Sequence, residues 1–406
     1  MAVARPHIVP ITLLLLLAAT SLQADVTIHC LAVGQADATL IVSSSGQTLL
    51  FDGGSNGDGD DIIVPYLTGL GITTLDYMAA SHFHADHVGG LDEVYNAVGV
   101  SQAVYDRGWS YTTQTYNSYA AAVASKRQTA TDGQVIDLGD GVTATVIALN
   151  GNGTLPAPFT DTDEENAYCL ALLVECGDFD FFVAGDLTGG YSSEEDVETS
   201  IAAEVGEIEV YRVSHHGSYT SSNTTFMAAT LPEVSIISVP DDSPYGHPHQ
   251  DTLDRLAAVG SYVYQTAQGS LATYPPGMRT IVNGHIVITS DGVGEYYVNG
   301  VMWETDEGGT AVPLAGALVL HGNYPNPFNP ATEVRFASPD GGPVRLSIHD
   351  LAGRVLRESA WDAAPGEQGW RWNGRDGNER EMPSGVYLYR VVTHGGTGSG
   401  LMTLAR

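Results

Sequence analysis

His82-Phe83-His84-Ala85-Asp86-His87 places three imidazoles and one carboxylate within six consecutive residues. The run follows an apolar stretch, Leu75 to Ala80, that is typical of a strand, and Gly89-Gly90 comes after it at the junction with an expected helix. Imidazole and carboxylate groups bind zinc and related divalent metals, and a cluster this dense can serve two ions. A surface tract of histidines is the alternative, but the strand-to-helix junction favours a metal site.

Three later points in the chain offer the further ligands that two metal ions need. Asp186 follows an apolar stretch that is typical of a strand, and His215-His216 follow another. His247 and His249 lie in a loop beyond a third. Each point alone is weak evidence, because an Asp after Gly is usually a turn residue and a His before Pro is usually on the surface. Together they predict acid and imidazole groups on successive strand ends, around two divalent ions.

The order of strands and helices predicts a layered α/β domain followed by a smaller all-β domain. Strands are expected at 26–33, 38–43, 47–51, 75–80, 142–149, 168–176, 179–184, 208–213, 236–239 and 261–265, and helices at 61–70, 88–98, 111–127, 194–205 and 252–259. Strands joined mainly by helical crossovers are typical of α/β layers. From Asn323 onward, Gly, Pro and Asp turns separate short strands without helical periodicity, which predicts a small immunoglobulin-like sandwich.

The N-terminus predicts export. Arg5 precedes the apolar run Ile11 to Ala19, and small Ala24 is a suitable last residue before cleavage. The run is too short to span a bilayer, which needs about 20 residues, so a secretory signal is favoured over a membrane anchor. Nothing later is long and apolar enough for a transmembrane helix. We therefore expect a signal peptide at 1–24, an α/β domain at 25–303, a linker at 304–322, a β-sandwich at 323–406, and a secreted or cell-surface protein.

Charge and cysteine content narrow the classes of partner and of site. The formal net charge is −32, and Lys126 is the only lysine. A long nucleic-acid binding surface needs many Lys and Arg side chains to contact phosphates, so any binding of nucleic acid is expected to be local. The acidity is interpreted as keeping an exported protein soluble. Cys30, Cys169 and Cys176 lie in apolar strand-like runs, which favours buried small hydrophobes over a metal site. Their odd number allows at most one internal disulfide.

Five segments carry a resemblance to a known family. Leu31 to Leu40, Leu50 to Gly54, Ser214 to Ser218, Tyr245 to His249 and Ile286 to Gly292 resemble, in order, motifs of the metallo-β-lactamase-fold hydrolases of the ComEC competence-protein type. The resemblance covers about residues 25–298. It implies an αββα sandwich and a hydrolase with two divalent metal ions, with zinc or manganese as candidates.

The resemblance also implies roles for the metal-binding residues. His82 and His84 would bind one ion, Asp86, His87 and His247 the other, with Asp186 bridging and either His215 or His216 completing the first ion. That last ligand is needed because the sequence has no histidine between residues 88 and 214. Which of His215 and His216 is the ligand remains undecided. Because the side chains of adjacent strand residues face opposite ways, the two histidines are not expected to bind the same ion.

Three further residues receive roles from the same resemblance. Asp52 would accept a hydrogen bond from a ligand imidazole and fix its tautomer. His249 would grip an anionic oxygen of the substrate or protonate a leaving group, with an ordinary loop histidine as the alternative. Cys169 stands where a serine is usual, which puts any role for that hydroxyl in doubt.

The resemblance favours phosphodiester hydrolysis by a metal-activated hydroxide that Asp86 helps to orient, with a nucleic acid or a small phosphoester as substrate. Hydrolysis of other esters, lactones, amides or thioesters is a second hypothesis, and a non-catalytic surface binding protein is a third. An aromatic lip for bases or a choline group would come from Arg107, Trp109, Tyr111, Tyr116 and Tyr119. Packing of a helix is the alternative explanation of that run.

The C-terminal segment has a separate resemblance. Asn323 to Pro330, Ile348 to Arg354 and Pro383 to Arg390 are similar to type IX secretion sorting domains and the related FlgD-like β-sandwiches. This implies that the type IX secretion machinery is a partner and that the module directs export or surface attachment. A spacer or adhesion module is the alternative.

Overall fold

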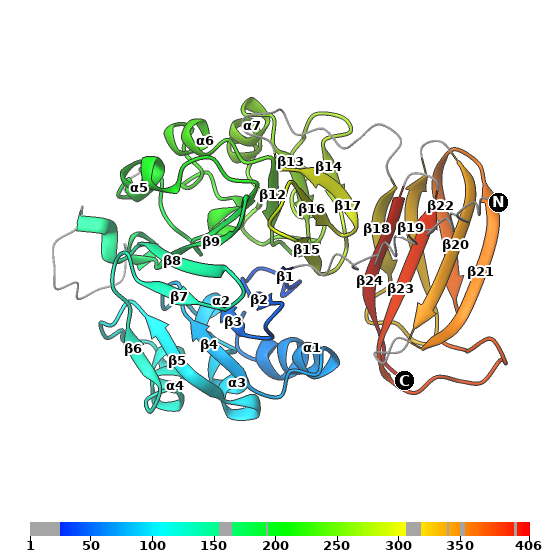
Figure 1. Cartoon of the computed structure of the whole chain (residues 1–406). Coiled ribbons are helices and arrows are strands. Elements are labelled where there is room, and N and C mark those ends of the chain that lie inside the picture. Colours follow the sequence, from blue (N-terminus) through cyan, green and yellow to red (C-terminus); the bar gives the residue numbers. More distant parts are fainter. Residues whose placement is uncertain are drawn as a thin grey trace, which may run out of the picture.

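The computed structural model describes residues 25–153, 165–191, 194–305, 318–338, 341–349, 354–393 and 396–406. The signal peptide expected at residues 1–24 lies outside the described residues. Figure 1 shows a larger body, in which two sheets are covered by helices on their outer sides, and a β-sandwich beside it. In the described part of the chain, no helix is long and apolar enough to cross a membrane.

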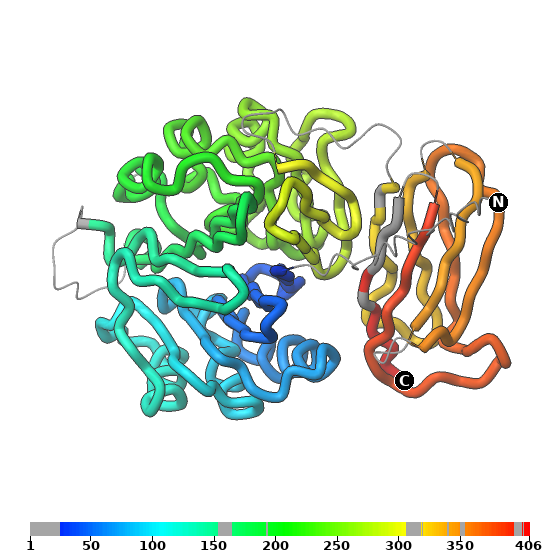
Figure 2. Tube along the Cα trace, viewed as in Figure 1, coloured from blue at the N-terminus to red at the C-terminus, as the bar shows by residue number. Residues whose placement is uncertain are grey.

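The first sheet combines the beginning and the end of the larger domain. In spatial order, its described strands are β17 (Val301–Glu304), β16 (Glu295–Val298), β15 (Ile286–Ser290), β1 (Val26–Cys30), β2 (Thr39–Ser43), β3 (Thr48–Phe51), β4 (Leu75–Ala79), β5 (Val100–Asp106) and β6 (Arg127–Thr129). β15 pairs antiparallel with β1, so the last strands return to the first one (Figure 2). From β3 to β6 the pairing is parallel.

The second sheet lies face to face with the first. In spatial order, its described strands are β14 (Arg279–Ile281), β13 (Tyr262–Gln265), β12 (Val234–Ile237), β11 (Val210–Arg212), β10 (Phe179–Val183), β9 (Ala171–Cys176), β8 (Val142–Ala148) and β7 (Val135–Asp137). From β10 to β14 the pairing is parallel. Fully buried side chains from both sheets, among them Ile28, Phe181 and Ile288, form one apolar layer between them.

Helices cover the outer face of each sheet. The described helices are α1 (Val64–Gly69), α2 (Ala85–Val88), α3 (Leu91–Val98), α4 (Gln114–Ala122), α5 (Val197–Val205), α6 (Thr224–Thr230) and α7 (Gln250–Ala258), with short helical turns η1 (Gly59–Ile63), η2 (Asn150–Gly153), η3 (Glu165–Tyr168) and η4 (Ser214–Gly217). Leu67, Leu91 and Tyr119 pack on the first sheet, whereas Ile201 and Leu253 pack on the second. The order is therefore helix, sheet, sheet, helix, which is the αββα sandwich expected from the sequence.

Several elements differ from the sequence-based expectation. The helix expected at 88–98 is divided into α2 and α3 at Gly89-Gly90, and the one expected at 111–127 ends at Ala122. Strand β5 was not expected, because Ser101 and Gln102 are exposed and interrupt the apolar pattern that marks a strand. Strand β18 begins at Val319, inside the segment expected to be a linker.

The C-terminal part folds into two facing sheets. One has, in spatial order, β18 (Val319–Tyr324), β19 (Thr332–Ser338) and β22 (Gly366–Trp372), and the other has β21 (Val355–Ala363), β20 (Gly342–His349), β23 (Gly385–Thr393) and β24 (Gly396–Leu404). Phe336, Leu346 and Trp372 are buried between the sheets. This is the small all-β sandwich that the turn-rich sequence predicts.

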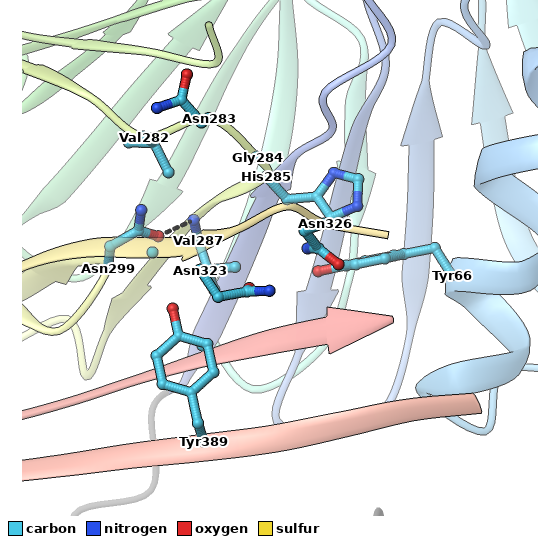
Figure 3. A pocket seen from close by; sticks show the side chains of 12 residues that line it. Tyr66, Val282, Asn283, Gly284, His285, Val287, Asn299, Asn323, Asn326 and Tyr389 are labelled. Atoms are coloured by element: carbon cyan, nitrogen blue, oxygen red, sulfur yellow. Dashed lines mark hydrogen bonds between the residues drawn. The ribbon is translucent and has the colours of Figure 1, made fainter. Parts of the chain in front are cut away.

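The sandwich packs against the larger domain on the side of α1 and β17. α1 contacts β23, and β17 contacts β24. A small cavity between the two parts is lined by Tyr66 and His285 from the larger domain and by Asn323, Asn326 and Tyr389 from the sandwich (Figure 3). The Asn- and Pro-rich segment that begins at Asn323 is therefore part of this contact.

Gly90 permits the close packing that sets the metal-binding cluster against the turn after β3. A Cβ atom at Gly90 would lie 2.3 Å from the carbonyl oxygen of Gly53 and 2.6 Å from the amide nitrogen of Gly59. Both are backbone atoms and cannot rotate away. We expect Gly90→Ala to lower the free energy of unfolding by about 1–3 kcal/mol, measured by urea unfolding.

The matched control for this substitution is Gly284→Ala, because no atom lies within 4 Å of a Cβ built there. The control should unfold within about 1 kcal/mol of the parent protein. Equal midpoints for Gly90→Ala and the parent would contradict the packing argument.

Candidate metal centre

The metal-ligating side chains converge where parallel strands of both sheets end. His82 comes just after β4, with Asp86 and His87 in α2. Asp186 comes after β10, and the histidine pair of η4 after β11. Because the carboxyl ends of neighbouring parallel strands meet at one edge of a sheet, residues far apart in sequence share one space. Asp86, Asp186 and the histidine pair of η4 line a pocket of about 620 Å³.

The first ligand set consists of His82, His84 and one oxygen of Asp186, and His215 lies next to that oxygen. Nε2 of His82 lies 3.0 Å from Nδ1 of His84 and 3.9 Å from Oδ2 of Asp186. Nε2 of His215 lies 3.6 Å from that same oxygen. Atoms that bind one zinc ion at about 2.0–2.1 Å in tetrahedral geometry are separated by about 3.4 Å, so this spacing suits a shared ion.

The second ligand set uses the other oxygen of Asp186. Oδ1 of Asp186 lies 3.2 Å from Nε2 of His87 and 3.7 Å from Nε2 of His216. Oδ2 of Asp86 lies 3.6 Å from the same nitrogen of His216. Asp37 stands close enough to belong to this group, with its Oδ1 at 3.7 Å from Nδ1 of His216. One carboxylate thus faces both sets, as a bridging ligand would.

Asp52 contacts the metal-binding cluster through His87 and Ser81. Its Oδ2 lies 2.8 Å from Nδ1 of His87, while its two oxygens accept hydrogen bonds of 2.7 Å from the amide and the hydroxyl of Ser81. A carboxylate on Nδ1 directs the other ring nitrogen of His87 toward the pocket, and such partners raise ligand basicity. The geometry agrees with the tautomer-fixing role expected for Asp52.

The His215-His216 pair is not in a strand. The two residues lie in η4 with φ values of 53° and 52°, in the left-handed region. That conformation costs a non-glycine residue about 1 kcal/mol or more and tends to persist at functional sites. The strand rule, by which adjacent side chains face opposite ways, does not apply to this turn. Both rings therefore approach Asp186, one at each oxygen.

His247 lies outside both ligand sets, although it lines the same pocket. Nε2 of Gln35 lies 3.1 Å from Nδ1 of His247, and Oε1 of Gln35 accepts a hydrogen bond from Ser243. An amide nitrogen can only donate, so Nδ1 accepts and the neutral ring carries its proton on Nε2. In this arrangement His247 is suited to donate a hydrogen bond. His249 lines the pocket as well, and its Nδ1 accepts from the amide of Tyr219 at 3.0 Å.

Charges in the centre are strongly coupled. Burial would raise the pKa of Asp186, but His215, His87 and His216 outweigh burial and hold it well below its usual range. Burial would lower the pKa of His87, but the carboxylates of Asp186 and Asp52 raise it well above its usual range. Burial lowers the pKa of His82 well below its usual value, aided by His87. Such shifts are typical of functional sites.

The donor set fits two divalent cations. Within the described residues, Nε2 of His87, Oδ1 of Asp186 and both ring nitrogens of His216 are buried without a hydrogen-bond partner. Buried polar atoms are normally paired, so this concentration in one place indicates that another group satisfies them. Imidazole nitrogen and carboxylate oxygen are the ligand atoms that zinc binds, and manganese also accepts them.

Comparison with known proteins identifies the family. A profile of the metallo-beta-lactamase superfamily matches residues 31–240, which is more than half of the 406 residues. The chain belongs to this superfamily. Its members are metal-dependent hydrolases, and both the αββα fold and the metal-binding His/Asp cluster of this chain agree with that membership.

Individual relatives of this superfamily member include competence proteins. Recombination protein 2 of Haemophilus influenzae is 28% identical over 244 residues, which covers 59% of this chain and 27% of that protein. ComE operon protein 3 of Bacillus subtilis is 26% identical over 231 residues, covering 54% and 28%. The chain thus spans about a quarter of the length of these relatives. A solved diphosphatase from the PhnP family has 11% identity and a TM-score of 0.36, covering 66% of this chain and 99% of that one.

Of the two explanations of the aromatic run between Arg107 and Tyr119, burial supports packing rather than a lip, and Trp109 is half-buried. Arg107, Tyr111, Tyr116 and Tyr119 are all buried. The Arg107 guanidinium lies 4.2 Å from the centre of the Phe83 ring and pairs with Glu165, whose carboxylate also accepts from the amide of Phe83. These residues therefore support the metal-binding loop from inside. The three cysteines are buried free thiols, as their apolar surroundings predict.

Sequence reasoning missed residues that the fold brings to the site from far away. Asp37 lies within a motif that was noted, but nothing marked it as a neighbour of His216, and its ion pair with Arg212 joins residues 175 positions apart. Tyr219 and Tyr245 flank the histidine motifs and line the pocket. Their position next to metal-ligating residues was the available signal.

Asp52→Asn should weaken metal binding while leaving the fold intact. The amide keeps the shape of the carboxylate but loses the charge that directs His87, so we expect metal affinity to fall about 10- to 100-fold in competition with a chelator. Glu175→Gln, at an exposed position on β9, is the control and should bind as the parent does. Equal affinities for Asp52→Asn and the parent would contradict this role.

Metal stoichiometry separates the roles of the two later histidine motifs. We expect two bound divalent ions in the parent protein, about one in His216→Ala, and two in His247→Ala, because only His216 belongs to a ligand set. Elemental analysis after gel filtration measures this, with circular dichroism as a check on folding. Loss of one ion from His247→Ala would restore the ligand role first expected for His247.

Proposed function

We propose that this hydrolase cleaves phosphodiester bonds with two divalent metal ions. The observation that carries the proposal is the pair of ligand sets that share Asp186 within one open pocket. Two cations a few ångströms apart suit the attacking and leaving oxygens of an in-line displacement at phosphorus. One relative is named a recombination protein and another a competence protein, and recombination acts on DNA.

Each residue of the centre has a distinct task in this proposal. His82, His84 and His215 would hold the first ion, and His87, His216 and Asp86 would hold the second, with Asp186 facing both groups. When bound, the ions lower the pKa of water so that hydroxide is available near neutral pH, and they neutralise charge that develops on the phosphoryl group. Asp86 orients the attacking oxygen.

The histidines at the mouth of the pocket act on the substrate. His247 donates a hydrogen bond to a substrate oxygen through Nε2, since Nδ1 is occupied by Gln35. His249 faces the same pocket and grips or protonates the departing group. Cys169 plays no part as a nucleophile, because burial raises the pKa of its thiol well above the usual value.

The metal-loaded protein should hydrolyse bis-p-nitrophenyl phosphate and single-stranded DNA. Chelation should abolish both activities and added metal should restore them, while Asp186→Asn should lower kcat/KM about 100-fold or more, because it removes the shared ligand. Product release is measured by absorbance and by gel. The exposed substitution Glu175→Gln is again the control.

The substrate panel also tests the competing hypotheses. Activity on the small diester but not on DNA would favour a phosphoesterase for small substrates, and selective cleavage of a phosphocholine ester would favour that class. Metal-loaded protein that hydrolyses none of them would contradict the proposal and favour non-phosphate esters, lactones or amides. Absence of stoichiometric metal would favour a non-catalytic binding protein.

We further propose that the protein is exported and that residues 318–406 serve as a sorting module for the type IX secretion machinery. The support is the apolar segment Ile11 to Ala19 with Ala24 behind it, together with the C-terminal motifs on a separate sandwich. Mass spectrometry of the secreted protein should find Asp25 as the first residue. A reporter that carries the sandwich should leave the cell of a type IX-secreting host, and retention of the reporter would contradict the sorting role.

A further inference from the structure

Two tyrosines stand exposed at the pocket that holds the metal centre. Tyr219 follows η4 and is 42% exposed, and Tyr245 precedes the His247 motif and is 68% exposed. A single exposed aromatic residue on a protein surface needs no explanation. Two in one pocket, each next to a histidine that lines it, form an aromatic surface that the metal centre itself does not require.

The rings form a connected series across the pocket. Tyr245 lies 5.8 Å from His247, which lies 4.8 Å from His249, which in turn lies 5.3 Å from Tyr219, all between ring centres. We call these four residues the aromatic rim. The outer members are the large, exposed ones, and the inner members are imidazoles. A planar group that enters the pocket can therefore contact aromatic rings from two separate loops, one at each end of the series.

The backbone beneath both tyrosines is fixed. Arg255 donates from Nη2 to the carbonyl oxygen of Tyr219 at 3.0 Å, and the amide of Tyr219 donates to His249. On the other side, Ser243 bonds Gln35 and accepts from the amide of His247 at 3.0 Å. These bonds anchor the loops that carry the two tyrosines before any substrate arrives, which lowers the entropic cost of binding.

Positive charge is missing from the pocket. None of the described residues that line it is Lys or Arg. Of the arginines close by, Arg212 is buried and paired with Asp37, and Arg255 donates to the backbone carbonyl oxygens of Tyr219 and Ser221. A polynucleotide held along its backbone needs a succession of cations, so this pocket can grip only the phosphate at the metals. Any further affinity must come from another part of the substrate.

We infer that the aromatic rim stacks a nucleobase, so that the substrate is the end of a single-stranded nucleic acid or a short oligonucleotide. This inference rests on the proposed phosphodiester hydrolysis and adds which part of the substrate the protein recognises. Stacking on aromatic rings suits every base and needs no phosphate contacts. Polar groups at the edge of the pocket suit the rim of a base, above all Oδ1 of Asn166, which is buried without a partner among the described residues.

A quaternary ammonium group is the other ligand that aromatic rings attract. An aromatic site for such a cation gains affinity from nearby carboxylates. The carboxylates that line this pocket, those of Asp86 and Asp186, lie at the metal ligand sets instead. The groups between Tyr219 and Tyr245 are imidazoles, and Nδ1 of His247 accepts a hydrogen bond from the amide of Gln35. The amides and hydroxyls of the lining, such as Gln35, Asn166 and Ser218, suit the polar edge of a base, which a quaternary ammonium group lacks.

The test compares two substrates that differ only in their bases. Metal-loaded protein is given single-stranded tetrathymidylate and the same tetramer with abasic residues. Tyr219→Ala and Tyr245→Ala should each lower kcat/KM on tetrathymidylate about tenfold, mainly through KM, whereas Tyr→Phe at either position should retain most of the parent value. On the abasic tetramer the Ala variants should equal the parent. Tyr324→Ala, which removes an exposed tyrosine of the sandwich, is the control.

Each outcome decides something different. If the parent cleaves neither tetramer nor bis-p-nitrophenyl phosphate, the proposed phosphodiester hydrolysis fails, whereas cleavage of bis-p-nitrophenyl phosphate alone overturns only the base-stacking inference. If it cleaves both tetramers equally and the Ala variants match it, the hydrolysis stands and the base-stacking inference is overturned. If the Ala variants lose more kcat/KM on p-nitrophenylphosphocholine than on tetrathymidylate, the group that the aromatic rim binds is choline and not a base. Tyr219→Leu and Tyr245→Leu, checked for two bound metals, exclude a folding effect of the Ala variants.

The dependence of KM on salt concentration is a second measurement, independent of the comparison between variants. Because the pocket offers one phosphate contact, KM for tetrathymidylate should change less than about threefold between 50 and 200 mM salt. A protein that neutralises many phosphates would lose orders of magnitude over the same range. A steep salt dependence would overturn the inference that bases, rather than the backbone, provide the grip.

Discussion

Two oxygens of one buried carboxylate, that of Asp186, each face a separate group of imidazoles, and this division organises the whole site. An isolated buried carboxylate would be costly, so its surroundings must supply positive charge. His87 and His216, whose pKa values are raised, do so at one oxygen, while the imidazoles of His215 and His82 face the other. The groups come from both sheets, so the face-to-face packing of the sheets and the geometry of the metal centre depend on each other.

The parts of the site that are local in sequence could be predicted. The cluster from His82 to His87 lies within six residues, and Asp186 follows a plain apolar strand. The layered fold and the later β-sandwich also follow from the spacing of strands, helices and turns. Each of these signals sits within a short window, where the period of apolar residues and the chemistry of turns are informative.

What could not be predicted depends on backbone conformation or on long-range contacts. The direction of both rings in His215-His216 follows from two successive left-handed residues, which no pattern of side chains reveals. The neighbour of His216, Asp37, arrives from the start of the domain. Arg107 and its aromatic companions look from sequence like a binding surface, but their burial is decided by the packing of α4 on Phe83.

The return of β15 to the side of β1 has a consequence for how the protein is made. Val26 pairs with Ser290, so the first strand of the domain has an open edge until the ribosome has produced nearly 300 residues. Pairing at such a separation is slow, and an unpaired edge strand is a template for aggregation. During synthesis there is therefore a long interval in which the first sheet is still incomplete. On the export route proposed above, that delay would keep the chain open for passage through a membrane.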